Sequence, residues 1–554
     1  MKELIEVARG VRPASLLLVN GRIVNLFTGE IEEGNLAIFG ERIAGVGDYE
    51  DGERIIDLQG EYICPALIDA HIHLESTYLH PFEYAKAVVP RGVLGVVSDL
   101  HEIANVCGIK GIKYYLEAFR NMPMDLYLMA PSCVPSSKLE TAGAKLDARK
   151  LSSLKTFGLG EVMNFPGVIG CDEDVLRKIR TFSGKVIDGH SPLLSGKELN
   201  AYISAGIMSD HETTRVEEGR EKLKKGMWLM IREGSSEKNL EELFPLINEF
   251  ERIMLVVDDR TCVDLLRDGD VDGVLRKAIK LGLDPIKAIK LCTLNPAMYL
   301  GLRDMGAIAP GYIANIITLK DLEEFKVSRV IYRGELVAKN GNMIKRLDFK
   351  KKRLKVMKVK KFKKEDLILR SEKEIFPVIE IIPGQIITRR LDVKVRREGD
   401  KIIPDPKEDV IKLVVVERHK GSGNIGIGLV KGFGLRRGAL ASSVAHDAHN
   451  IIACGIWDED IYGAIKEVER LGGGLVAYDG KVLASLPLPI AGLLSNEPLE
   501  NVVARLEELE RTARDMGCEL PSPFHTLSFL ALPVIPELKL TDKGLVDVMK
   551  GRIL

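Results

Sequence analysis

The sequence predicts an α/β protein: a (β/α)8 barrel with a split small β domain and a C-terminal α+β domain. Between residues 63 and 305, eight short apolar runs alternate with longer helical patterns, and turn-rich β-like segments flank that stretch on both sides. Such alternation is typical of parallel strands joined by crossover helices. Eight strands in about 240 residues match a barrel in number and size. A doubly wound sheet is the alternative.

Composition excludes several classes of protein. The chain has 554 residues, 45% of them hydrophobic, and 79 Lys and Arg against 80 Asp and Glu. Roughly 150 residues per domain allows three to four domains. Balanced charge argues against a nucleic-acid binder, and no apolar run is long enough for a membrane span. The start, MKELIEVARG, lacks the apolar core of a secretory signal. Eight scattered cysteines without a CxxC pair indicate reduced thiols in a cytoplasmic protein.

The small β domain is expected in two segments, residues 1–62 and 306–345. In the first, SLLLVNGRIVNLFTGEIEEGNLAIFGERIAGVG predicts short strands joined by Asn-Gly, Thr-Gly and Glu-Gly turns. In the second, GAIAPGYIANIITLKDLEEFKVSRVIYRGELVAKNG is β-like again, with Gly-Tyr and Asn-Gly turn signals. We expect it to complete the sheet that the first segment begins.

The barrel is expected over residues 63–305. Its strand candidates, in chain order, are ICPALIDAHIH, VLGVVSD, DLYLMAPS, FGLGEV, KVIDGH, AGIMSDH, MWLMIREG and RIMLVVDD.

The C-terminal domain is expected over residues 355–554, with strands in DLILR, VIEIIP and KLVVVERH and amphipathic helices in DIYGAIKEVERL and LENVVARLEELERTARDMG. The preceding basic segment, residues 345–364, is interpreted as a solvated linker and edge strand. A nucleic-acid or membrane patch is the alternative. The Gly-rich KGSGNIGIGLVKGFG lacks the Gly-Lys-Ser/Thr ending of a phosphate loop and indicates turns.

Histidines gather where the predicted strands end. Five of the ten in the chain do so, namely His71, His73, His101, His190 and His211. Barrel enzymes place their sites at this face. Alternate residues of a strand point the same way, so His71 and His73 should project together while the intervening isoleucine packs inward. Two imidazoles placed in this way can hold one divalent metal ion.

Acids at other strand ends extend this pattern to two metals. Glu161 ends GLGE, His190 ends VIDGH, His211 ends IMSDH and Asp258 ends MLVVDD. Four imidazoles and two carboxylates can hold two divalent ions, with Glu161 bridging them. Such a site keeps a slight positive charge after it binds hydroxide, which favours ionisation of bound water. Asp259, on the opposite face of the strand, is the alternative to Asp258.

These motifs resemble a known superfamily. HxH in strand one, an acid in strand four, histidines in strands five and six and Asp in strand eight, with the split β domain, are similar to the amidohydrolase superfamily. Many members use a carboxylated lysine where Glu161 stands. PALIDAHIHLEST, SDLHEIANVCG, GLGEVMNFPGV, DGHSP, SDHE, REGS and VVDDR resemble the adenine deaminase family, as does GLVKGFGLRRGALASSVAHDAHNI, so the resemblance covers nearly the whole chain.

The resemblance implies an activity and a ligand set. Adenine would be hydrolysed at C6 to hypoxanthine and ammonia, in purine salvage, by a hydroxide that bridges two metals. The ligands of one metal would be His71, His73, Glu161 and Asp258, and those of the other Glu161, His190 and His211. The family suggests manganese, and imidazole with carboxylate also suits iron or zinc. The expected partner is adenine, with no nucleic acid and no membrane, and symmetric dimers are the common oligomer.

Residues around the metals suggest proton transfer and substrate binding. Asp258 is placed to take the proton of the hydroxide. Glu102 is the candidate acid beside the purine ring, with His101 next to it. Arg232 could orient the purine, and its alternative is a salt bridge to Glu233 or the barrel rim.

The C-terminal domain offers one more candidate group. His446 and His449 flank Asp447 in SSVAHDAHNI, and in a helix they would share a face and could point at the barrel mouth. We include His449 among the residues expected to contact substrate. A locally hydrogen-bonded pair is the alternative.

Two other functions compete. Another cyclic amide or amidine hydrolase of the same superfamily is the first, and the SDHE and REGS segments argue against it. A non-catalytic scaffold is the second, and the presence of all six ligand candidates argues against it.

Overall fold

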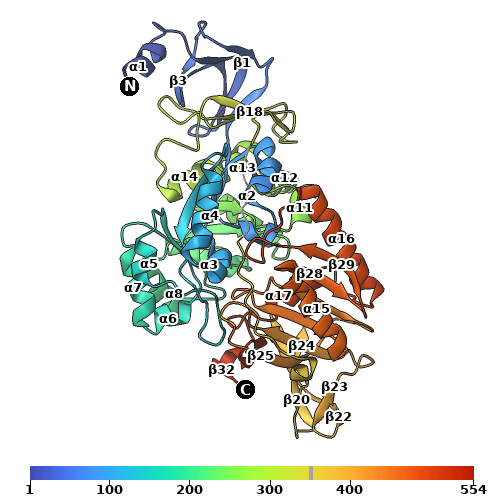
Figure 1. Cartoon of the computed structure of the whole chain (residues 1–554). Helices are drawn as coiled ribbons and strands as arrows, with labels where there is room; N and C mark the ends of the chain where they lie inside the picture. The colour runs from blue at the N-terminus through green and yellow to red at the C-terminus, as the bar shows by residue number, and fades with distance from the viewer. Residues whose placement is uncertain (348–353) are drawn as a thin grey trace.

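The computed structural model describes residues 1–347 and 354–554. Three regions follow one another in space (Figure 1): a small β region around the N-terminus, an α/β region in the middle, and a C-terminal region that lies against the α/β region. All eight cysteines are free thiols. Within the described ranges, no helix is long and apolar enough to cross a bilayer.

The small β region is one sheet built from both ends of the α/β region. Its strand order is β19-β18-β17-β16-β5-β1-β2-β3, with β4 beside β1. Strand β16 runs antiparallel to β5, with Ile317 opposite Cys64, which confirms that the second segment completes the sheet. The bounds are α1 (Lys2–Ala8), β1 (Leu16–Asn25), β2 (Glu30–Phe39), β3 (Arg42–Gly47), β4 (Ile55–Asp57), β5 (Tyr62–Pro65), β16 (Ile316–Leu319), β17 (Val327–Tyr332), β18 (Glu335–Lys339) and β19 (Asn342–Met343).

Two of the predicted turns in this region are wrong. Asn20 and Gly21 lie inside β1, where the register shifts between Leu18 and Gly21 and Asn20 has a φ of 57°. Gly34 lies inside β2, paired with Gly21. Asn20 has in this bulge the positive φ that an Asn-Gly turn also requires. The Asn-Gly dipeptide therefore did not distinguish a bulge from a turn. The Thr-Gly prediction is confirmed, because residues 28–29 lie in the turn between β1 and β2.

The α/β region contains parallel strands at each of the eight predicted runs. They lie in sheets of five (β11-β10-β9-β8-β6), three (β12-β13-β14) and two strands (β15-β7). A backbone bond from Met208 N to Ile187 O, 3.0 Å long, joins the five-stranded and three-stranded sheets. The two-stranded sheet continues the other two along the chain, because β15 follows β14 and β7 follows β6. The first run is divided, because β5 belongs to the small β sheet and only β6 and β7 to the parallel strands. The bounds are β6 (Leu67–Asp69), β7 (Ile72–His73), β8 (Val93–Ser98), β9 (Asp125–Ala130), β10 (Gly158–Val162), β11 (Val186–Gly189), β12 (Ser209–Asp210), β13 (Trp228–Arg232), β14 (Ile253–Val256) and β15 (Asp258–Asp259).

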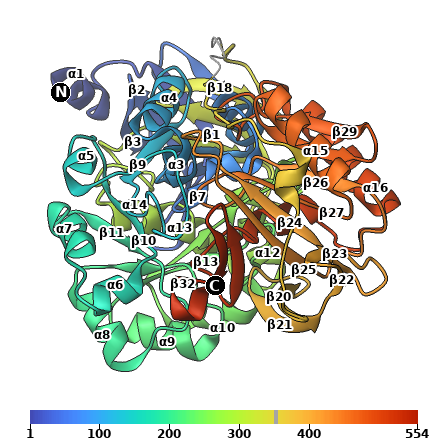
Figure 2. The same ribbon diagram turned by 60° about the horizontal axis from the view of Figure 1, so that its bottom comes forward.

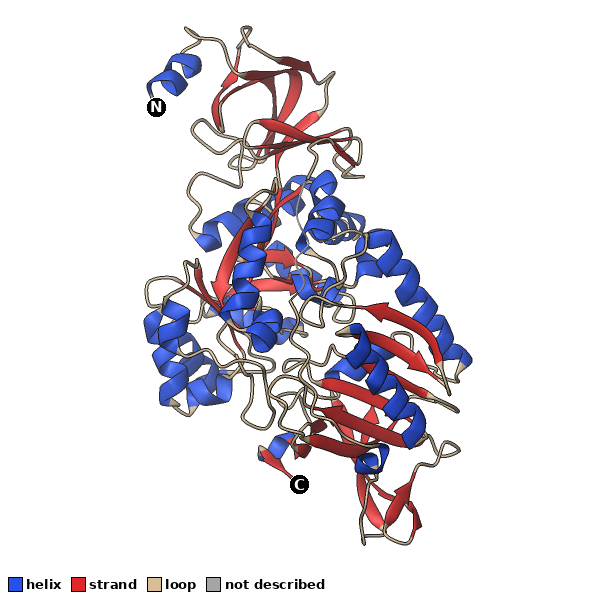
Figure 3. Ribbon diagram, in the orientation of Figure 1, coloured by secondary structure: helices blue, strands red, loops and turns tan. Residues whose placement is uncertain are grey.

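Helices follow the parallel strands and surround them (Figure 3). Between the strands, Ile68, Tyr127, Met230 and Met254 form part of one buried apolar cluster. The helices of this region are η1 (Leu74–Thr77), α2 (Pro81–Val88), η2 (Val89–Arg91), α3 (His101–Cys107), α4 (Ile109–Phe119), α5 (Ala148–Ser152), α6 (Phe165–Ile169), α7 (Glu173–Thr181), α8 (Gly196–Ser204), α9 (Val216–Lys224), α10 (Leu240–Glu249), α11 (Cys262–Arg267), α12 (Val271–Lys280), α13 (Pro285–Leu291) and α14 (Leu294–Leu300).

The C-terminal region is built on an eight-stranded sheet, β21-β20-β25-β24-β27-β26-β28-β29. Helix α15 covers one face, where Ile461 and Val468 pack with Val414 and Val476 (Figure 2). Both predicted helices are confirmed as α15 and α16. The bounds are η3 (Lys364–Leu367), β20 (Ile375–Ile381), β21 (Thr388–Lys394), β22 (Arg396–Glu398), β23 (Lys401–Ile403), β24 (Val410–Val416), β25 (Ile425–Lys431), β26 (Ala439–Ser442), β27 (Ile451–Gly455), α15 (Asp458–Leu471), β28 (Gly474–Tyr478), β29 (Val482–Pro487), α16 (Leu499–Asp515), α17 (Pro523–Phe529), β30 (Leu538–Thr541), β31 (Gly544–Asp547), η4 (Val548–Lys550) and β32 (Arg552–Ile553).

Two expectations near residue 360 fail. DLILR is not a strand, because η3 ends inside it and only an isolated bridge forms at Arg370. The predicted edge strand in the basic segment is wrong over residues 354–363, which have no regular structure. Residues 348–353 of that segment lie outside the described ranges. The basic stretch alternates basic and apolar residues as a strand can, and DLILR is apolar like a buried strand, but η3 occupies residues 364–367 and no ladder forms in the described part of either stretch.

The C-terminal region packs firmly against the α/β region. Thr141 N donates to Asp542 Oδ1 at 2.8 Å, and Ser495 N donates to Tyr78 O at 2.7 Å. One hydrophobic cluster contains Ile103 of α3 together with Phe524 of α17. The contact places the segment around residue 446 beside the ends of the parallel strands.

Candidate metal centre and active site

Six side chains meet at the carboxyl ends of the parallel strands. His71 directly precedes β7, His73 ends it, Glu161 lies in β10, and Asp258 opens β15. His190 and His211 directly follow β11 and β12. Five of the six residues are at most 6% exposed, and His190 is half-buried. The predicted ligand set is therefore brought together in a largely dry site.

Glu161 lies at the centre of this set. Its Oε1 is 3.4 Å from His73 Nε2. Its Oε2 is 2.7 Å from His190 Nδ1 and 3.4 Å from His211 Nε2. The two oxygens of one carboxylate thus face two separate groups of histidines, which is the arrangement that a bridging ligand requires.

The aspartate that joins the cluster is Asp258. Its Oδ1 is 3.1 Å from His73 Nε2 and 3.5 Å from His71 Nε2. Its backbone φ of 62° lies in the left-handed region. Asp259 instead accepts a hydrogen bond from the Ser76 hydroxyl. The geometry therefore favours Asp258 over Asp259 as the ligand candidate.

The donor set fits divalent ions. His71 Nε2 is completely buried and has no hydrogen-bond partner, although buried polar atoms rarely lack one. The rings of His71 and His211 stack with their centroids 4.0 Å apart. Several groups of three donors lie within 4.8 Å of one another, among them His71, His211 and Asp258; His71, His73 and Glu161; and Glu161, His190 and His211. Neutral imidazoles and carboxylates at this spacing suit Mn, Fe or Zn.

The charges of the cluster also favour cations. Burial raises the pKa of Glu161, but His190 and His211 outweigh burial and hold that pKa well below its usual range. Burial lowers the pKa of His73, yet contacts that include Asp258 and Glu161 raise it to about 10. The carboxylates are therefore ionised, and the negative potential that attracts protons to His73 attracts metal ions equally.

A second polar group lies beside the first. His101 begins α3, and its Nδ1 is 2.9 Å from Asp99 Oδ1 and 3.6 Å from Glu161 Oε1. Its Nε2 is 3.3 Å from Glu102 Oε1. His446 Nδ1 lies 2.5 Å from the same Glu102 oxygen, and His449 Nε2 contacts Glu102 Oε2. Glu102 is thus the point where the C-terminal region reaches the site.

Residues 446–449 form a turn and not the helix in which the two histidines would have shared a face. Both imidazoles nevertheless point the same way and contact the carboxylate of Glu102. A turn closed by the bond from His449 N to Ala445 O, 2.7 Å long, brings them together instead.

Known proteins match the chain over its whole length. The amidohydrolase family model matches residues 62–337, and the model of the adenine deaminase C-terminal domain matches residues 385–552. An adenine deaminase of Dehalococcoides mccartyi is 54% identical over 563 residues, covering 100% of this chain and 99% of that protein. The chain belongs to the adenine deaminase family of amidohydrolases. Adenine deaminase 2 of Carboxydothermus hydrogenoformans is 48% identical over 559 residues, covering 99% of this chain and 98% of that protein.

Among solved structures, a β-aspartyl dipeptidase from Fervidobacterium islandicum AW-1 is 17% identical, with a TM-score of 0.45, and its match covers 61% of this chain and 100% of that chain.

In this member of the adenine deaminase family, Arg232 holds carboxylates. Its Nη1 is 2.7 Å from Asp258 Oδ2 and 2.6 Å from Glu212 Oε1. The alternative salt bridge to Glu233 does not form, because Glu233 pairs with Lys277 at 2.8 Å. Sequence reasoning did not assign a role to Glu212, which also lies 3.4 Å from His211. Its signal was its position directly after a strand-end histidine, in the SDHE segment.

A cavity borders the site from the C-terminal side. It has a volume of about 170 Å³, and Ser236, His525 and Phe529 are among the residues that line it. Phe529 stacks on the His446 ring with the centroids 4.5 Å apart. Ser235, also in the lining, donates from its backbone to Asp259 O at 2.8 Å. The cavity therefore lies next to the C-terminal histidines and the backbone of Asp259, and none of the six metal-ligand candidates lines it.

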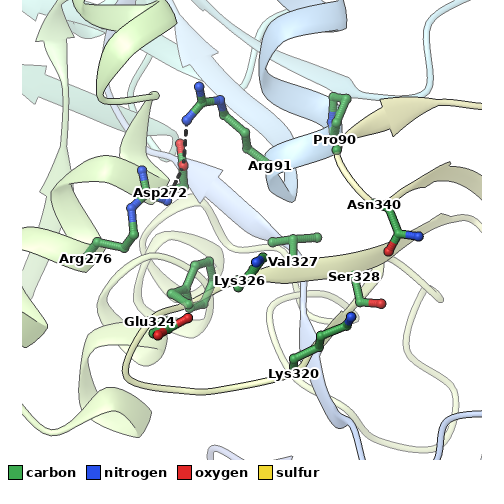
Figure 4. Close-up of a pocket in the computed structure, with 12 residues that line it drawn as sticks. Pro90, Arg91, Asp272, Arg276, Lys320, Glu324, Lys326, Val327, Ser328 and Asn340 are labelled. Carbon is green, nitrogen blue, oxygen red and sulfur yellow. Dashed lines mark hydrogen bonds and ion pairs between the residues drawn. The ribbon is translucent and has the colours of Figure 1, made fainter.

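A surface cleft of about 550 Å³ lies elsewhere, where the small β region meets the α/β region (Figure 4). Arg91 and Arg276 both point toward Asp272 in its wall, at 3.6 and 2.6 Å. None of the six metal-ligand candidates lines this cleft.

Proposed function

We propose that the chain hydrolyses adenine at C6, with water as co-substrate and hypoxanthine and ammonia as products. The observation that carries the proposal is Glu161, whose two oxygens face two separate histidine groups in a chain of the adenine deaminase family. Full-length relatives that are named adenine deaminase support the choice of adenine as substrate.

The residues that would hold two divalent ions are those predicted from the sequence. One ion would be bound by His71, His73, Glu161 and Asp258, and the other by Glu161, His190 and His211. Ions in this position supply a hydroxide nucleophile near neutral pH by lowering the pKa of water. We expect manganese, with iron or zinc as substitutes.

Asp258 is proposed as the base. Arg232 holds its Oδ2 at 2.7 Å, so that Oδ1 remains directed at His71 and His73. A carboxylate fixed in this way can take the proton of the nucleophile and pass it to the leaving amino group. Because the guanidinium of Arg232 is engaged by two carboxylates, we propose that it acts mainly by holding Asp258. A direct contact of Arg232 with the purine stays a prediction.

Glu102 and His101 are proposed to serve the ring nitrogen of adenine. Negative charge develops on the ring as hydroxide adds to C6, and a nearby proton donor stabilises it. Burial raises the pKa of Glu102, but His446, His449 and His101 hold it well below its usual range. The carboxylate is therefore ionised. The proton that reaches the ring would be held on His101 or His446, whose pKa values nearby carboxylates raise, and not on His449, whose pKa burial lowers to about 4.

The architecture is proposed on the same basis. The three parallel sheets are linked by the Met208 bond and by the continuation of β14 into β15 and of β6 into β7, and they would form one closed (β/α)8 barrel over residues 63–305. The small β domain (1–62 and 306–345) and the C-terminal domain (355–554) would flank it. We propose a cytoplasmic homodimer in purine salvage.

The test is ammonia release by metal-free protein after addition of Mn²⁺, Fe²⁺ or Zn²⁺. Adenine should be turned over once two ions are bound per chain. A panel of cyclic amides and amidines serves as the comparison, because another hydrolase of the superfamily is the second candidate function. Turnover of a panel member without turnover of adenine would contradict the proposal.

A further inference from the structure

The carboxylate of Glu102 is gripped at both oxygens by the C-terminal domain. His446 Nδ1 lies 2.5 Å from Oε1, and His449 Nε2 contacts Oε2. These partners stand 344 and 347 positions later in the chain. All three residues are nearly inaccessible, with exposed fractions of 3% for Glu102, 6% for His446 and 1% for His449. We call Glu102, His446 and His449 the Glu102 clamp.

The three residues are close enough to hold a metal ion of their own. The hydrogen bonds of His449 argue against that reading. Its Nδ1 accepts from Ala445 N at 3.2 Å, so in the neutral ring the proton resides on Nε2. A metal at Nε2 would move that proton to Nδ1, where it would face the backbone N–H of Ala445. His449 is therefore built as a hydrogen-bond donor to Glu102.

The backbone that carries the two histidines is itself held on several sides. His446 N donates to Ser528 O at 3.1 Å, and the His446 ring stacks on Phe529. The buried Arg418 donates from Nε to the carbonyl of His449, whose own φ is 54°. Strained backbone that is fixed by its surroundings is typical of functional sites. The backbone that carries the imidazoles of His446 and His449 is therefore fixed by contacts on several sides.

The clamp is linked to the metal cluster by His101. Glu102 Oε1 is 3.3 Å from His101 Nε2, and the other nitrogen of that ring is 3.6 Å from Glu161 Oε1. A path of polar contacts therefore runs from the C-terminal domain to the proposed bridging carboxylate.

We propose that His446 and His449 are positioning residues of the reaction: they fix the orientation of the Glu102 carboxylate toward His101, so that the C-terminal domain completes the proton path of the barrel. This inference rests on the proposed function and refines it, because His449 acts through Glu102 and not on adenine directly. It also gives the C-terminal domain a role in the site. Among the described residues, only His449 of that domain holds Glu102 Oε2.

A set of His449 variants tests the donor role. His449→Gln keeps an N–H where Nε2 stands, His449→Asn keeps an acceptor for Ala445 N but is too short to reach Glu102, and His449→Ala keeps neither. We expect kcat to fall about 10- to 100-fold in His449→Ala and His449→Asn, and much less in His449→Gln. The KM for adenine should change less than kcat, and two metals per chain should remain.

His419→Gln is the matched control. His419 is a buried histidine of the same domain whose Nε2 bonds the carbonyl of Ala448, next to His449, and not Glu102. Its kcat should stay within about twofold of the parent. An equal loss of kcat in His419→Gln and His449→Ala would mean that loop packing explains both effects, and the positioning role would be abandoned.

The double variant of His449→Ala and Glu102→Gln tests most directly whether His449 acts through Glu102. If His449 acts only through Glu102, His449→Ala should lower kcat little further in the Glu102→Gln background. Full additivity, or a third metal per chain that His449→Ala removes, would overturn the inference. The melting temperatures of the parent, His449→Ala, Glu102→Gln and the double variant measure the coupling between His449 and Glu102 without turnover. Absence of adenine turnover in the parent would defeat the proposed function, whereas absence of coupling in the melting temperatures would defeat the clamp.

Discussion

Replacement of Asp258 by asparagine should remove most turnover while leaving the fold in place. The amide keeps the shape of the side chain, and asparagine tolerates the left-handed φ of 62° found at this position. It cannot take a proton from the nucleophile, and it is a weaker metal ligand than a carboxylate. The effect should therefore appear in kcat and in metal content before it appears in stability.

The magnitude follows from the contacts of Asp258. General base catalysis contributes about 10²- to 10⁴-fold, or about 3 to 5 kcal/mol of the barrier, and kcat should fall by that factor. Loss of one partner from a buried ion pair usually costs about 3 to 5 kcal/mol. Arg232 keeps Glu212, at 2.6 and 3.0 Å, so we expect a smaller loss of about 1 to 2 kcal/mol in the free energy of unfolding.

The assay is steady-state ammonia release from adenine, with metal content and thermal unfolding recorded on the same preparation. Asp259→Asn is the matched control, since Asp259 bonds Ser76 and stands outside the histidine cluster. Its kcat should fall less than about tenfold. A damaging Asp259→Asn beside a mild Asp258→Asn would refute the assignment of the base.

Three further predictions concern neighbouring and distant residues. Glu161→Ala should lose one or both metals and nearly all activity, and metal analysis checks it; two ions per chain with normal turnover would contradict the bridging role. Gly160→Ala would bring a Cβ within 2.4 Å of the Cβ of Asp99, so we expect kcat to fall by about tenfold or more as Asp99 and its partner His101 move; unchanged kinetics would show that the strand can shift freely. Burial lowers the pKa of Lys539 to about 7, so the unfolded chain binds more protons above that pH and native stability rises with pH through this window. Lys539→Met should therefore be more stable than the parent near pH 7, by about 1 to 3 kcal/mol, and the gap should shrink toward pH 10; a gap that widens with pH in denaturant titrations would exclude this cause.

Much of the fold followed from local patterns. Short apolar runs that alternate with helical patterns predicted the parallel strands, and each run contains one in the structure. The carboxyl ends of parallel strands lie on the same face of a barrel, so polar residues at these ends lie close together. That geometric rule explains why His71, Glu161 and His211 could be grouped from sequence, and why the β segments at residues 306–345 could be joined to the first sheet.

Local patterns failed where two kinds of local structure favour the same residues. Asn20 and Gly21 satisfy a turn and a bulge equally, and only the pairing of β1 with β2 selects the bulge. The basic stretch before η3 alternates like an edge strand, but a strand also needs a continuous ladder with a neighbour. Residues 354–363 make only single backbone bonds, such as Lys358 N to Arg418 O at 2.8 Å. Sequence periodicity reports the preference of one segment and contains no information about its partner.

The sequence by itself therefore determined which residues stand at the strand ends and which chemistry they can perform. Only the tertiary structure decided which of two adjacent aspartates faces the histidines, because this depends on the exact register of β15 beside β7, which periodicity does not fix. It also decided that His446 and His449 meet Glu102, 344 and 347 positions away. Contacts of that kind depend on the packing of two regions far apart in the sequence, and such packing is fixed by shape and buried area over many residues rather than by any local motif.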